Sequence, residues 1–187
     1  MSKILSGAAL AAAAMLLVGC DTTSAVMGYA PSTTNVLAFQ SALKPSGATV
    51  KVGDFTAGAG VAAPSCRLAG ALDVSQGKPL QQYVRDALQT ELFTAQVYDG
   101  ASPVTLKGNL DEVKVNTFGT GSWTLGLQVT SNRDPVGYHV SATREFKTSY
   151  SAIAACQNAT NAFAPTVQDL LGQVINNPGF AKLVGKG

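Results

Sequence analysis

Hydrophobic and polar residues follow regular patterns along the middle of the chain. Residues 48–55 alternate, which is typical of a strand with one buried face, and residues 68–74 indicate a short second strand. From Pro79 onward, apolar residues recur at intervals of three and four as far as Leu92, and a proline suits the first turn of a helix. This pattern predicts an amphipathic helix whose apolar stripe is interrupted by Glu91.

The next three segments also alternate and are predicted to be strands, over residues 104–115, 123–130 and 138–146. The second of them has the clearest alternation, so we expect one of its faces to be buried and the other to face water. In the first, the alternation slips by one residue across Asp111 and Glu112, which predicts a β-bulge.

The C-terminal part has a helical pattern. Residues 152–176 place their apolar side chains on one face, and Pro165 is expected to kink or restart this helix. A last short helix is expected with Asn177 as its cap, Pro178 as its first residue and its end near Val184. The order β-α-β-β-β-α predicts an α+β fold over residues 48–187, with one antiparallel or mixed sheet and two helices packed on one face.

The N-terminal segment has a different pattern. Lys3 precedes an unbroken apolar run of 11 residues from Ala8 to Val18. That length suits the core of a signal peptide and is too short to span the roughly 30 Å of a bilayer's hydrocarbon. We expect residues 1–19 to be removed as a signal peptide and no transmembrane helix to remain.

The four residues Leu17-Val18-Gly19-Cys20 resemble the lipobox of bacterial lipoproteins. This resemblance implies that Cys20 carries a diacylglyceryl group on its sulfur and becomes the first residue, anchored in the envelope of a Gram-negative bacterium and facing the periplasm. The alternative is an ordinary signal peptide with an unrelated cysteine near its cleavage site. Asp21 resembles the inner-membrane retention signal of enteric bacteria, and which membrane holds the protein is left open.

Residues 20–47 contain Ser, Thr and Pro and few charges, so we expect a lipidated N-terminus followed by a tether. The apolar residues Val36 to Phe39 in its middle are candidates for docking on the domain. Charged residues make up only 13% of the chain, and the formal net charge of +2 falls to +1 when Lys3 is removed with the signal peptide. This balance gives no basic surface for nucleic acid.

Two cysteines remain after lipidation, Cys66 and Cys156. In an oxidising compartment such a pair indicates one disulfide. A metal pair or two free thiols are the alternatives. A zinc site would need further ligands, and the chain has a single histidine, His139.

Few side chains suggest catalysis. His139 alternates with Tyr138 and Val140, so it is expected to face solvent, and no Ser or Cys motif accompanies it. Asp111 and Glu112 are adjacent on a strand and are interpreted as solvated carboxylates at the bulge rather than an acid–base pair. We therefore expect no enzyme, no metal and no cofactor.

Arg144 occupies an apparent inward position between Ala142 and Phe146. Because burying a guanidinium is costly unless it is paired, an ion pair, a strand edge or a register shift would explain this position. The alternative is a site that faces a ligand or partner on the open side of the sheet. Trp123 has two similar interpretations, as a core anchor or as a binding-surface aromatic.

The helix PLQQYVRDALQTEL, the strand GSWTLGLQV and the tail FAPTVQDLLGQVINNPGFAKLV resemble small envelope lipoproteins of the YajG type. More distantly, they are similar to auxiliary lipoproteins of ABC-type transporters. The resemblance implies the fold and offers no catalytic residue. We expect a non-catalytic, membrane-anchored accessory lipoprotein that binds an envelope protein. The alternative is an auxiliary subunit of a transport system that binds a lipid or another amphiphile.

Overall fold

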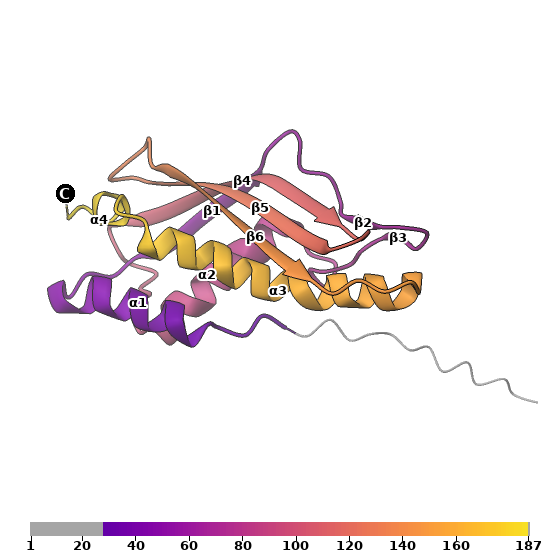
Figure 1. The fold of residues 1–187 in the computed structure, drawn as a ribbon. Coiled ribbons are helices and arrows are strands. Elements are labelled where there is room, and N and C mark those ends of the chain that lie inside the picture. Colours follow the sequence, from indigo (N-terminus) through magenta and orange to yellow (C-terminus); the bar gives the residue numbers. More distant parts are fainter. Residues whose placement is uncertain (1–27, 187) are drawn as a thin grey trace, which may run out of the picture.

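The computed structural model describes residues 28–186 and shows a four-stranded mixed sheet with helices on one face (Figure 1). The strands lie in the order β1-β4-β5-β6, with β1 parallel to β4 and the other neighbours antiparallel. The predicted signal peptide, Cys20 and Asp21 lie outside the described residues. The four strands are β1 (Lys51–Ala57), β4 (Thr105–Asn116), β5 (Gly121–Ser131) and β6 (Tyr138–Phe146). The predicted α+β fold with a mixed sheet is confirmed.

The parallel pair β1 and β4 is joined by the amphipathic helix α2 (Leu80–Thr94), because parallel neighbours need a crossover connection. Its apolar stripe faces the sheet and buries residues that include Val84, Leu88 and Leu92. The predicted helix is therefore confirmed.

The predicted bulge lies in β4, where the register with β5 shifts between Leu110 and Glu112. In a strand without a bulge, Val113 and Val115 would face the opposite side of the sheet from Leu110, because they follow it by odd numbers of residues. With it, Val113 and Val115 pack against the same core as Leu110.

Strand β5 carries the centre of the core, as its alternation predicts. Trp123, Leu125, Leu127 and Val129 are completely buried. The indole Nε1 of Trp123 donates a hydrogen bond to the backbone carbonyl of Ala159 at 2.8 Å. Trp123 is therefore a core anchor, and the prediction of a buried face is confirmed.

Helix α3 (Ala152–Asn176) crosses the sheet on the same side as α2. The hydroxyl of Ser151 caps its first turn by accepting from the Ala154 N–H. Pro165 lies inside the helix, which continues without a break, so a restart there is wrong. The predicted last helix is α4 (Phe180–Leu183), which begins two residues later than predicted, with Gly179 rather than Asn177 at its N-cap.

The predicted tether needs correction. Residues 33–46 fold as helix α1 (Thr33–Leu43) and the 3-10 turn η1 (Lys44–Ser46). Val36, Phe39 and Leu43 are spaced by three and four residues and are buried. Helix α1 covers the side of α2 and α3 that faces away from the sheet (Figure 1). The domain thus begins before residue 33 rather than at 48, and it has three principal helices rather than two.

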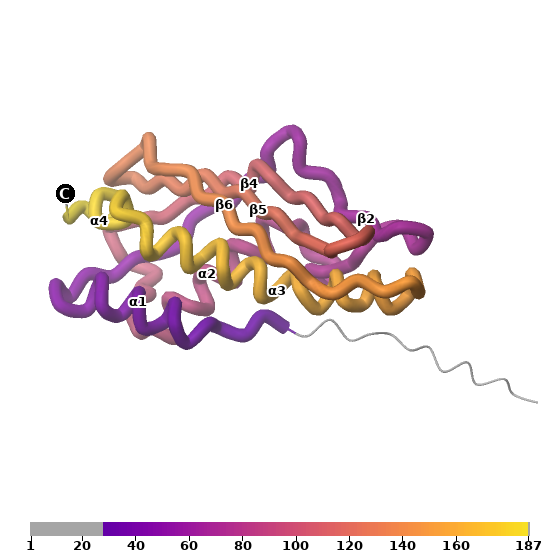
Figure 2. The backbone as a smooth tube through the Cα atoms, viewed as in Figure 1, coloured from indigo at the N-terminus to yellow at the C-terminus, as the bar shows by residue number. Residues whose placement is uncertain are grey.

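The chain enters the domain beside the middle of α3, as Figure 2 shows. There the side chain of Gln168 donates to the carbonyl of Ala30 at 2.8 Å. The segment predicted as a short strand over residues 68–74 is instead part of a small hairpin, β2 (Ser65–Cys66) and β3 (Gly70–Ala71). Leu68 at its turn has a φ of 57°, which ends the extended conformation.

Candidate functional site

The described part of the chain places the predicted site residues at two separate positions. Cys66 and Cys156 lie together at one end of the sheet, and Arg144 lies along the edge strand β6. Cys20, the predicted lipidation site, is outside the described residues.

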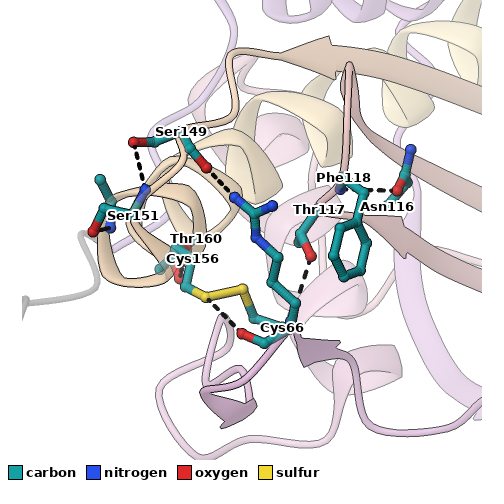
Figure 3. Close-up of a disulfide and its surroundings, with 10 residues drawn as sticks. Cys66, Asn116, Thr117, Phe118, Ser149, Ser151, Cys156 and Thr160 are labelled. Carbon is teal, nitrogen blue, oxygen red and sulfur yellow. Dashed lines mark hydrogen bonds between the residues drawn. A yellow bond between two sulfur atoms is a disulfide. The ribbon is translucent and has the colours of Figure 1, made fainter.

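The disulfide joins the end of β2 to the second turn of α3 (Figure 3). The Cα atoms of Cys66 and Cys156 are 5.7 Å apart, and 90 residues separate them in sequence. Both cysteines are buried. The bond matches the prediction from the two remaining cysteines.

Arg67, the residue after Cys66, links the β2–β3 turn to two further loops. Its backbone N–H donates to the hydroxyl of Thr117 at 3.4 Å, and its guanidinium donates to the Ser149 carbonyl. The guanidinium carbon also lies 5.0 Å from the centre of the Phe118 ring, within range of a cation–π contact. The β2–β3 turn, the β4–β5 turn and the loop before α3 are therefore held together (Figure 3).

Arg144 pairs with Asp169 of α3. Its Nε and Nη2 atoms donate to the two carboxylate oxygens at 2.7 Å each, a bidentate arrangement. The hydrogen bonds to Asp169 raise the pKa of the guanidinium above its already high value. Of the explanations left open by the sequence, the ion pair and the strand edge both hold, because Arg144 pairs with Asp169 and β6 is an edge strand. Arg144 faces the helix side, so the predicted partner-facing position on the open side of the sheet is wrong.

A polar groove of about 510 Å³ runs beside this ion pair, between the edge of β6, α3 and the start of α1. Its walls are formed mainly by side chains that carry amide, hydroxyl and charged groups. They include Ser32, Asn35, Thr143, Arg144, Gln168 and Gln173.

A buried carboxylate network holds the N-terminal segment to α2, and sequence reasoning did not find it. Glu91 is completely buried, and its Oε1 accepts from the Tyr29 hydroxyl, the Ser32 N–H and the Asn35 amide. Burial raises the pKa of Glu91 against the opposing effect of these hydrogen bonds. Its Oε2 has no partner among the described atoms. The interruption of the apolar stripe was the signal in the sequence.

The open face of the sheet is polar. His139 is exposed there and lies 3.1 Å from Asp111 at the bulge, which agrees with the predicted solvent-facing positions. Within residues 28–186, no three His, Cys, Asp or Glu side chains are grouped so that they could hold a metal ion. Across the same residues, no helix is long and apolar enough to cross a membrane.

The alternative function, binding of a lipid or amphiphile, requires an apolar pocket between sheet and helices. Side chains fill this space: Trp123 and Phe163 have ring centroids 5.0 Å apart, and Leu125, Leu127 and Leu170 are completely buried. The groove at the β6 edge is polar. A smaller hollow of about 250 Å³ beside the start of α2 is lined by apolar residues that include Val61, Leu72 and Leu80, and the alternative stays a prediction.

Comparisons with known proteins add a limited amount. No family model and no curated protein matches the chain. A solved structure of a DUF330 protein from Xanthomonas campestris is similar, with 11% identity, a TM-score of 0.46, and coverage of 68% of this chain and 83% of that one. An uncharacterised protein has 12% identity, a TM-score of 0.37, and coverage of 68% and 92%. Neither similarity assigns a family, and the resemblance to the YajG type stays a prediction.

Proposed function

We propose that this chain is a non-catalytic bacterial lipoprotein, lipidated at Cys20 and anchored to a membrane of a Gram-negative envelope with its domain in the periplasm. The observation that carries the proposal is the lipobox-like sequence Leu17–Cys20 after an apolar run of 11 residues. The disulfide between Cys66 and Cys156 supports it, because structural disulfides persist in oxidising compartments outside the cytoplasm.

Metabolic labelling with radioactive palmitate tests the anchor. The wild-type protein should incorporate label and sediment with membranes, whereas Cys20→Ser should carry no label and retain residues 1–19. Separation of the two membranes on a density gradient then tests whether the protein lies in the inner membrane, as its Asp21 suggests. Label in the Cys20→Ser variant, or an unlabelled wild-type protein, would contradict the proposal.

The accessory role in this proposal is the binding of an extended segment of another envelope protein along β6. Strand β6 lies at the edge of the sheet, so a further strand has backbone groups to pair with there. Side chains of such a segment would enter the groove beside Arg144 and Asp169. The amides and charges of the groove suit a polar segment rather than an apolar one.

A photo-cross-linkable amino acid at Gln173, in the groove, tests this role in living cells. The matched control is the same amino acid at Thr90, which is exposed on α2. One envelope protein recovered from the Gln173 position and absent from the Thr90 position would support partner binding at β6. Equal recovery from both positions, or recovery of abundant lipoproteins alone, would contradict it.

A further inference from the structure

Large apolar side chains are exposed together at the disulfide-bonded end of the domain. Seven such side chains are exposed among the described residues, and four of them lie at this end, three on its loops and one in the first turn of α3. Leu68 is 98% exposed, and Tyr150 is fully exposed. We call this set the apolar cap: Leu68, Phe118, Tyr150 and Ile153.

The segments that bear the apolar cap are joined to one another by a disulfide and by hydrogen bonds. The disulfide fixes the β2–β3 turn, which bears Leu68, to α3, which bears Ile153. Arg67 lies against the ring of Phe118 and donates to the carbonyl next to Tyr150. The Thr148 hydroxyl donates to the Gly119 carbonyl and joins the remaining pair of loops. Exposed apolar side chains on a cross-linked framework of this kind mark an interaction surface.

The charge of these loops suits an anionic surface. Residues 66–70, 117–120 and 145–156 contain the basic residues Arg67 and Lys147 and one acidic residue, Glu145, which leaves a net charge of +1. Apolar area combined with basic side chains is the composition that binds the interface of an anionic bilayer. Aromatic side chains such as Phe118 and Tyr150 suit the boundary between headgroups and acyl chains.

The length of chain before the domain allows this end to reach the membrane. Ala30 is ten residues after Cys20, so the two lie at most about 33–36 Å apart. Ala30 is fixed to Gln168, which is fifteen residues after Ile153 on α3, or about 22 Å along the helix. When extended, this part of the chain is long enough for a lipid on Cys20 to reach the plane of the apolar cap.

We propose that the apolar cap rests on the surface of the bilayer that holds the Cys20 lipid, with α3 rising from the membrane at its N-terminal end. This inference rests on the proposed lipidation. It defines the orientation of the domain, in which the β5–β6 turn and α4 lie at the end away from the membrane (Figure 1).

The test uses the mature lipidated protein in vesicles of phosphatidylcholine and phosphatidylglycerol. An environment-sensitive dye is attached to Ile153→Cys in one sample and to Val136→Cys, in the exposed β5–β6 turn, in the other. Iodide quenching of the dye at position 153 should be at least about threefold weaker than at position 136, because bilayer contact excludes the aqueous quencher. Equal quenching at the two positions would overturn the inference.

A second variant tests whether the cap makes the contact. Leu68→Ser, Phe118→Ser and Tyr150→Ser are combined in the protein labelled at Ile153→Cys, and circular dichroism checks its fold. Quenching at position 153 should rise to the level of the control position while the protein still floats with vesicles. Unchanged protection would overturn the inference, as would protection that increases with protein density and so reports a second copy.

Mass spectrometry of the same samples separates the two proposals. If Cys20 is diacylated and quenching is equal at both dye positions, the proposed lipoprotein function is supported and the proposed orientation of the domain is contradicted. A Cys20 without lipid on a protein that does not float removes the proposed function, and the orientation with it.

Discussion

Removal of the disulfide should lower the stability of the domain by an amount that follows from its position. The change is the double variant Cys66→Ala and Cys156→Ala. The bond closes a loop across 90 residues, and the chain-entropy relation gives a loss of about 4.6 kcal/mol in the free energy of unfolding for a loop of that length. For a domain of this size, that loss corresponds to a fall in Tm of about 9–18 °C.

Urea unfolding followed by the fluorescence of the buried Trp123 measures the loss directly. The slope of free energy against urea should also increase, because an unfolded chain without the cross-link exposes more surface. Wild-type protein treated with a reductant is the control and should match the double variant. A loss below about 1 kcal/mol with an unchanged slope would refute the reasoning, since the bond would then not restrict the unfolded chain.

Three further predictions concern single side chains. Asp169→Asn should lower the free energy of unfolding by less than about 1 kcal/mol, because the side chains of Arg144 and Asp169 are about 40% exposed. At high salt the loss should be smaller still, since salt screens exposed charges. A loss above about 2 kcal/mol in urea unfolding would contradict this. Burial raises the pKa of the Glu91 carboxyl above 4.5, so the folded protein holds the carboxyl proton more tightly than the unfolded chain does. The contribution of Glu91 to the free energy of unfolding therefore falls as the pH rises from 4.5 through the raised pKa of the folded protein. Glu91→Gln cannot titrate, so its stability relative to wild type should increase between pH 4 and pH 8, and a constant difference would count against the buried acid. Trp123→Phe should cost about 1–3 kcal/mol, measured by thermal unfolding, because it leaves a void and removes the indole hydrogen bond to the Ala159 carbonyl. A neutral effect would exclude that role.

The elements that the sequence predicted well are those in which apolar residues recur at a regular spacing within the segment itself. The alternation from Trp123 to Val129 reports a strand with one buried face, whatever the identity of its neighbours. Helix α3 has the limits predicted for residues 152–176, because its apolar side chains share one face and Asn177-Pro178 follows its end. The bulge in β4 was also visible, since a change of phase is a local signal.

The features that sequence reasoning missed depend on contacts between distant segments. Helix α1 has apolar residues on several sides and no clear apolar stripe, and Val36, Phe39 and Leu43 become buried because α2 and α3 present a surface for them. The hydrogen-bond donors to Glu91 lie 56 to 62 residues earlier, at Asn35, Ser32 and Tyr29. A charged residue in the apolar stripe was therefore visible in the sequence, but its partners were not. The acceptor for Arg144 is likewise on another element, 25 residues away.

The correction at α1 also changes what kind of partner the groove can serve. The chain from Cys20 to residue 47 would span at most about 89–97 Å, whereas the ten residues from Cys20 to Ala30 span at most about 33–36 Å. The groove at β6 includes Ser32, two residues after Ala30, so it lies close to the point where the chain enters the domain. With Cys20 lipidated as proposed, a segment that binds this groove must come within a few tens of ångströms of the same bilayer. The proposed partner is therefore a protein that is itself embedded in or bound to that membrane, and cross-links from Gln173 should be found in the membrane fraction rather than among soluble periplasmic proteins.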